Sequence, residues 1–221
     1  MNDRNDEDEP DDDLEDERSH SLFHTSTGLV DFVIIEEQLR QLADYSDALA
    51  KFSEGQLLDL KAEYPDYNRD DCDYEAFETI WNLKENVEFV TPAMLLMTLY
   101  VFFEKSLKTL CYSFKDGHSD YEIPKGTRFK TPGKNYESII DSQLRYLREH
   151  CGFTFELNDD EIDLLDTCRN VRNDFAHGDW HNVRSTIDTL KIGNILHLIS
   201  AVFDKIERGS PPHPQSQSDP N

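Results

Sequence analysis

Hydrophobic residues recur every three or four positions along most of this chain, and that spacing places them on one face of a helix. Strand-like alternation of hydrophobic and polar residues appears nowhere over a useful length, and no repeat has a solenoid period. The segments with the helical pattern are 29–52, 74–87, 91–114, 135–152, 158–178 and about 186–208. We therefore expect an all-α fold, a bundle of five to six helices.

Several of these segments carry local signals for a helix end. Thr91 and Pro92 fit the N-cap and the first helical position, because proline lacks only an N–H that is unpaired there in any case. Asn158, with Glu161 three residues later, is close to a capping box. Gly178 fits the left-handed residue that often follows a helix. The sequence therefore predicts helix starts at Thr91 and Asn158 and a helix end at Gly178.

Both ends of the chain have compositions that do not form a core. The first twenty residues hold eleven acidic residues against two arginines, and so few apolar groups cannot offset the entropy of ordering. The other end is polar and rich in Pro and Ser. We expect a disordered acidic tail at 1–26, a helical domain at 27–208 and a second disordered tail at 209–221. The acidic tail is either a solvating segment or a polyanion that occupies a basic groove of this protein or a basic partner.

Net charge, cysteine spacing and hydrophobicity indicate which partners and which cellular compartment the sequence favours. The formal net charge of −24 argues against non-specific binding to duplex nucleic acid, which needs a basic face. The four cysteines include no CxxC pair, which favours reduced thiols. The longest apolar run, 93–103, is too short to span a bilayer and continues into charged residues. We therefore expect a cytoplasmic protein with no membrane association.

One segment is basic against this acidic background. Between the third and fourth helical segments, four cations and an aromatic residue occur with no acid among them. These residues are Lys125, Arg128, Phe129, Lys130 and Lys134. Either the segment offsets an acidic neighbour, or its cations contact RNA phosphates while Phe129 stacks on a base.

The segment 169–178, RNVRNDFAHG, gathers hydrogen-bond donors at the end of a predicted helix. Arg169, Asn173 and His177 are four residues apart and share one stripe, with Arg172 one step to its side. The apolar residues expected on the opposite, core-facing side are Leu164, Leu165, Cys168, Val171, Phe175 and Ala176. Histidine is the side chain best suited to proton transfer near neutral pH. Spacing alone leaves two interpretations open: a capping histidine with solvated arginines, or a reactive site.

The stretch RNDFAHG (172–178), which follows LLDTCRNV on the penultimate long helix, resembles the signature of the HEPN superfamily. That signature is an arginine followed by a polar residue, a gap and a histidine. The resemblance implies that Arg172, Asn173 and His177 form the catalytic set. It also implies an acidic residue on an earlier helix that faces the site. The residues expected to support the site are Glu104, Arg169 and Lys108.

Proteins of this superfamily are commonly metal-independent endoribonucleases that act as dimers. The resemblance therefore implies a homodimer whose substrate is RNA, cleaved by attack of a 2′-hydroxyl on its own phosphate, with no cofactor. It further implies a toxin or an effector of defence or stress responses, with an antitoxin or regulatory protein as a possible partner. The lysines and arginine of segment 125–134 are the expected RNA-binding residues.

Two alternatives stand beside the nuclease. One is a non-catalytic HEPN-like module that dimerises or binds a nucleotide, RNA or a protein. The other is a structural adaptor that uses its acidic tail. We do not expect a metal site around His177, Asp179 and His181, because no second cluster of ligands is spaced to complete it.

Overall fold

The computed structural model describes residues 22–65, 74–114 and 138–211. Its helices are α1 (Val30–Glu63), α2 (Tyr74–Glu85), the π-helical turn η3 (Asn86–Val90), α3 (Thr91–Ser113), α4 (Ile139–His150), α5 (Asp159–His177), α6 (Trp180–Ile187) and α7 (Ile192–Arg208). Since α2, η3 and α3 form one continuous helix, the described residues contain six helices and no strand. The predicted all-α bundle is confirmed. Most of the two predicted tails lies outside the described residues.

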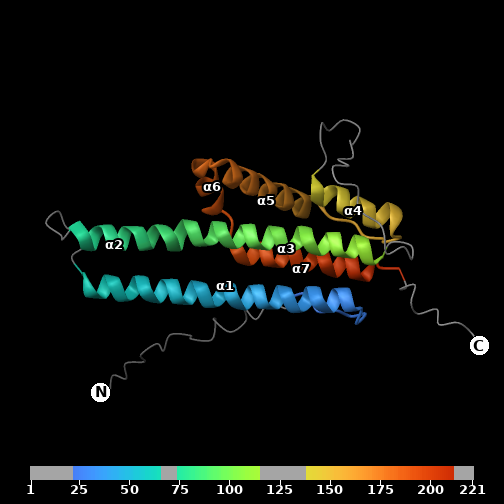
Figure 1. Ribbon diagram of the computed structural model, residues 1–221, viewed down its shortest axis with the longest axis horizontal. Coiled ribbons are helices and arrows are strands. Elements are labelled where there is room, and N and C mark those ends of the chain that lie inside the picture. Colours follow the sequence, from blue (N-terminus) through green and yellow to red (C-terminus); the bar gives the residue numbers. More distant parts are fainter. Residues whose placement is uncertain (1–21, 66–73, 115–137, 212–221) are drawn as a thin grey trace, which may run out of the picture.

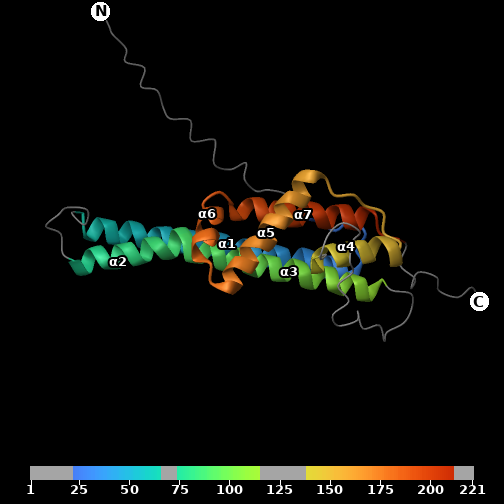
Figure 2. The ribbon, with the colours of Figure 1, turned by 90° about the horizontal axis from the view of Figure 1, so that it is seen from above.

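The helix α3 lies at the centre of the bundle and contacts α1, α4, α5, α6 and α7. In Figure 1, α1 runs along one side of the continuous α2–α3 helix in the opposite direction, and α4, α5 and α6 follow one another along the other side. The far ends of α1 and α2 extend beyond the remaining helices (Figure 2). This arrangement explains why the first half of α3 is apolar almost all round.

The hydrophobic core has two parts. The larger part joins α1, α3, α4, α5 and α7, and its fully buried side chains include Phe32, Leu39, Phe103, Leu107, Leu110, Leu147, Ile199 and Phe203. A smaller cluster lies under α5 and α6 and comprises Phe89, Ala93, Leu96, Val171, Val183 and Ile187. The smaller cluster fixes the C-terminal half of α5, which carries the motif residues, against the first half of α3.

By length and composition, the continuous helix Tyr74–Ser113 could cross a membrane. Its most apolar window of 18 residues has a mean hydropathy of 1.5, and 44% of that window is buried within the fold. The core helix of a soluble protein has the same properties, and α3 is the helix around which the others pack. One such helix is therefore weak evidence for a membrane span.

The predicted N-cap at Thr91 is wrong. Val90 is helical (φ −64°, ψ −46°), its side chain makes no capping hydrogen bond, and the helix runs through from α2. The N–H of Thr91 bonds to the carbonyl of Asn86, five residues earlier, as in a π turn. A proline inside an α-helix lacks a donor and clashes with the carbonyl four residues before it. The π turn before Pro92 relieves both problems, because it changes the local hydrogen-bond register.

The predicted ends of α5 are confirmed. Asn158 and Glu161 form a reciprocal capping box, with both side-chain-to-backbone bonds at 2.8 Å. Gly178 ends the helix in the left-handed conformation (φ 74°, ψ 22°). The last predicted helix, about 186–208, corresponds to α7, which begins later, at Ile192. The short helix α6 before it was not predicted.

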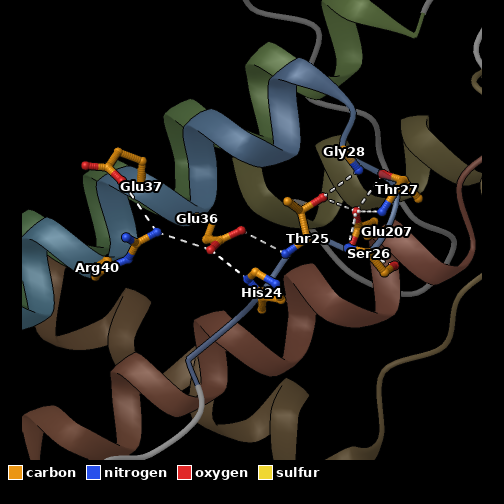
Figure 3. Close-up of polar contacts among 9 residues, drawn as sticks. All are labelled: His24, Thr25, Ser26, Thr27, Gly28, Glu36, Glu37, Arg40 and Glu207. Atoms are coloured by element: carbon orange, nitrogen blue, oxygen red, sulfur yellow. Dashed lines mark hydrogen bonds and ion pairs between the residues drawn. The ribbon is translucent and has the colours of Figure 1, made fainter.

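The described fold begins earlier than the boundary expected at residue 27. Phe23 is only 4% exposed and packs in the main core. The next residues, Thr25, Ser26 and Thr27, donate hydrogen bonds to the buried carboxylate of Glu207 near the end of α7 (Figure 3). The sequence did not indicate this attachment, because a short polar stretch next to an acidic run has the composition of a tail.

Candidate functional site

The motif residues lie on the side of α5 that faces away from the core. Leu165, Cys168 and Val171 point into the core. That orientation leaves Arg172 and His177 exposed and Asn173 half-buried. The residues Leu164 and Phe175 are half-buried, but Ala176 is exposed rather than core-facing, so that part of the prediction is wrong. Ala176 was misassigned because it lies at the edge of the apolar sector, only 40° around the helix from Arg172.

Arg172 and Asn173 contact each other directly. The guanidinium Nη1 of Arg172 donates to the side-chain oxygen Oδ1 of Asn173 at 3.2 Å. A guanidinium has five N–H donors in a fixed fork, so four remain for an external anion. The asparagine therefore orients the arginine without using up its capacity to bind a phosphate.

Arg169 makes ion pairs at the edge of this site. Its Nη1 lies 3.0 Å from Oδ1 of Asp166 on the same helix and 4.0 Å from Oδ2 of Asp141 on α4. Two carboxylates therefore compensate the charge of Arg169. This residue links α5 to α4, and its contacts fit a supporting position better than a free phosphate-binding position.

Tyr100 is a buried residue of α3 whose hydroxyl interacts electrostatically with charged residues of α3, α4 and α5. Burial raises the pKa of its hydroxyl to about 12, and the nearby Glu104 carboxylate adds to this effect. The guanidinium groups of Arg169 and Arg172 are also near enough to act on the hydroxyl, in the opposite direction. Glu104 and the two arginines are therefore all within electrostatic range of the Tyr100 hydroxyl.

Sequence reasoning assigned Tyr100 only to the core. Its position one helical turn before Glu104 is the signal that could have placed it near the site. Lys108 lies one turn beyond Glu104, is exposed, and has its ammonium 5.8 Å from the centre of the Tyr112 ring.

His177 stands at a sharp corner of the backbone. The N–H of Gly178 bonds to the carbonyl of Phe175 at 3.2 Å, and the N–H of Asp179 bonds to that of Asp174 at 2.9 Å. These bonds satisfy carbonyl groups at the end of α5 and turn the chain into α6. The imidazole is thereby left exposed at the corner, where a ligand can reach it.

The cysteines in the described part of the chain are poorly suited to chemistry. Cys168 is buried, and burial raises the pKa of its thiol to about 12. Burial likewise raises the pKa of Cys111, with a further contribution from nearby Cys151. A thiol with a raised pKa is a weak nucleophile at neutral pH. Within residues 22–65, 74–114 and 138–211, no three His, Cys, Asp or Glu side chains gather as metal ligands.

The four predicted RNA-binding cations, Lys125, Arg128, Lys130 and Lys134, lie outside the described residues. Their role stays a prediction. Comparison with protein-family models, curated proteins and solved structures gives no match to this chain.

Proposed function

We propose that this protein is a metal-independent endoribonuclease of the HEPN type, which works as a homodimer in the cytoplasm. The observation that carries the proposal is the set of motif residues at the end of α5, where Arg172 and His177 are exposed and Asn173 is half-buried. Their side chains are not needed by the core, and the arginine keeps free donors after its contact with Asn173. A guanidinium fork is suited to binding a phosphodiester, and an exposed imidazole is suited to proton transfer.

The reaction needs few groups. A base removes the proton of the 2′-hydroxyl, whose oxygen forms a bond to the neighbouring phosphorus. The bond from phosphorus to the 5′-oxygen breaks, and an acid protonates that leaving oxygen. His177 serves as base or acid, and the guanidinium of Arg172 stabilises the extra charge on the phosphate. The products are a 2′,3′-cyclic phosphate and a 5′-hydroxyl, and DNA is not a substrate because it lacks the attacking group.

The homodimer follows from the number of proton transfers. The single motif histidine of each chain, His177, cannot act as base and acid in the same step. A second copy of the chain would supply the other imidazole. An exposed apolar stripe on α3, formed by Met94, Val101 and Tyr112, supports a partner surface. These positions are 7 and 11 residues apart, close to two and three full turns, and therefore share a face. A toxin or defence role, with an antitoxin or regulatory partner, comes from the HEPN resemblance alone.

The test is cleavage of RNA by the purified full-length protein in EDTA. We expect His177→Ala and Arg172→Ala to lower the cleavage rate by at least about a hundredfold, the usual scale for a general acid–base or a charge-stabilising group. Matched controls are His181→Ala on α6 and Arg208→Ala, whose exposed side chain pairs with Asp204. Both controls should keep the wild-type rate. An oligonucleotide with one 2′-deoxy residue should resist cleavage at that residue.

A second candidate function is a non-catalytic binding module. The ion pairs of Arg169 with Asp166 and Asp141 favour it, because they place carboxylates beside the motif that would repel a phosphate. In that case RNA stays intact with the wild-type protein, and a gel of end-labelled RNA shows the same pattern with and without His177→Ala. That outcome would overturn the nuclease proposal.

A further inference from the structure

Trp180, the first residue of α6, belongs to an aromatic cluster with Phe175 and Phe89 but is largely exposed. Its side chain is 52% exposed. Even so, its indole packs nearly perpendicular to two other rings. The centroid distances are 5.0 Å to Phe175 on α5, at an angle of 77°, and 6.2 Å to Phe89 in η3, at 84°. The indole is therefore held in place on one side and open to solvent on the other.

The cluster beneath the indole is itself well fixed. Phe89 is buried, and the guanidinium of Arg184 lies 4.3 Å from the centre of its ring. Arg184 also forms an ion pair with Glu85 in the last turn of α2. Aromatic pairs and a cation over a ring each add specific attraction beyond area burial. A ring oriented in this way loses little freedom when a ligand stacks on it.

The indole lies next to the motif. A Cβ placed on Gly178 would be 3.9 Å from the indole Nε1, so the N–H edge of Trp180 is close to the residue that follows His177. Phe175, which supports the indole, is one helical turn beyond Arg172 on the same side of α5. A nucleotide whose phosphate reaches Arg172 and His177 would therefore have a flat aromatic surface within reach of its base.

We propose that Trp180 stacks on a nucleobase of single-stranded RNA bound at the end of α5. This inference rests on the proposed function and extends it from a phosphate site to a site that also holds a base. Unstacked bases of RNA are commonly held on aromatic side chains, and a single stack tolerates any base. Asp174 and Asp179 are the carboxylates nearest in sequence. That of Asp179 accepts from the side-chain nitrogen of Asn182 at 2.9 Å as it caps α6, which draws part of its charge away from the ligand.

The first experiment follows the fluorescence of Trp180. The chain has two tryptophans, so Trp81→Phe leaves Trp180 as the sole tryptophan, which is excited selectively over the tyrosines at long wavelength. His177→Ala in the same protein keeps the RNA intact. We expect saturable quenching by a single-stranded RNA of about ten nucleotides, within the usual range of site sizes. A matched oligomer without bases has the same phosphates and should quench little. Equal quenching by both oligomers, or none by either, overturns the stacking site.

The second experiment measures RNA affinity by anisotropy in the His177→Ala background with three Trp180 variants. Trp180→Phe keeps an aromatic face and should stay within about threefold of the parent, whereas Trp180→Ala should weaken binding by about 5- to 150-fold. Trp180→Leu keeps apolar contact with Phe175 and Phe89 but offers no ring, and should behave like Trp180→Ala. Circular dichroism confirms that each variant is folded.

The two proposals fail in different ways. Cleavage that depends on His177 but is unaffected by Trp180→Leu would remove the stacking site and keep the nuclease. Base-dependent binding at Trp180 in a wild-type protein that cleaves no RNA would keep the stacking site and remove the nuclease.

Discussion

The carboxylate of Glu207 accepts a hydrogen bond of 2.6 Å from the hydroxyl of Thr27, which lies 180 positions earlier in the chain. The same carboxylate accepts from the hydroxyl of Thr25 and from the backbone N–H groups of Ser26 and Thr27. Glu207 is only 1% exposed, and a buried charge is tolerated only when such donors replace water. The segment that leads into α1 is therefore attached to the last helix through one acidic side chain (Figure 3).

Glu207→Gln should destabilise the fold by about 1.5–3 kcal/mol at pH 7, the usual contribution of hydrogen bonds to a charged group. Burial by itself raises the pKa of Glu207, but the donated hydrogen bonds outweigh it and hold the pKa below its ordinary value. A lowered pKa means that this stabilisation is present at neutral pH and is lost as pH falls below about 4.5, the ordinary value for a glutamate.

Urea unfolding of wild type and Glu207→Gln at neutral and acidic pH measures this effect. The difference in unfolding free energy should shrink as the wild-type carboxylate becomes protonated. The control is Asp204→Asn, which removes the surface partner of Arg208 and should change stability by less than about 1 kcal/mol. A difference between wild type and Glu207→Gln that stays constant with pH would contradict the assigned role of the charge.

The contrast between Glu207 and Asn158 shows which features the sequence could predict. The capping box of Asn158 and Glu161 is local, so three-residue spacing was enough to find it. The donors to Glu207 are about 180 residues away, and no local pattern indicates them. The helix start predicted at Thr91 was wrong for a third reason. Proline is tolerated both at a helix start and after a π turn, and the sequence does not distinguish these two cases.

The same distinction applies to the candidate site. Helical spacing places Arg169, Asn173 and His177 on one flank of α5 without any knowledge of the fold. The proximity of Tyr100 to Arg172 depends on how α5 crosses α3, which is decided by packing in the small cluster under α6. The stack of Trp180 on Phe175 and Phe89 depends on that packing as well, so neither relationship could be read from spacing.

Gly178→Ala should destabilise the fold by about 1–2 kcal/mol, because Gly178 has a φ of +74° and a side chain is strained there. The matched control is Gly55→Ala inside α1, where an added Cβ meets no atom within 4 Å and φ is not positive. That substitution should be neutral or stabilise by up to about 1 kcal/mol, since alanine favours a helix over glycine. Chemical unfolding measures both, and equal effects of the two variants would refute the distinction.

The described cysteines should be hidden from thiol reagents in the folded protein. Cys111, Cys151 and Cys168 are buried and form no disulfide, and burial raises the pKa of Cys168 to about 12. In a Cys72→Ser variant, we expect a chromogenic disulfide reagent to react slowly at pH 8 under native conditions and rapidly in urea, with three thiols released. Rapid reaction of any thiol in the native protein would show that the core around α3 and α5 opens more easily than its packing indicates.

Tyr100→Phe should reduce the loss of stability that the protein suffers at high pH. The pKa of Tyr100 is raised to about 12, above the ordinary value of 10.0, so the folded state holds this proton more tightly than the unfolded state. The resulting stabilisation is complete below pH 10 and is lost as pH rises toward 12. Phenylalanine keeps the ring and has no proton to lose, so its unfolding free energy should fall less over that range. The exposed Tyr45 provides the control, because Tyr45→Phe should leave the wild-type pH dependence unchanged.

A difference spectrum at the tyrosinate band between wild type and Tyr100→Phe gives an independent measure of the pKa of Tyr100. Ionisation of Tyr100 near pH 10 instead of about 12 would mean that burial does not raise the pKa of its hydroxyl as described.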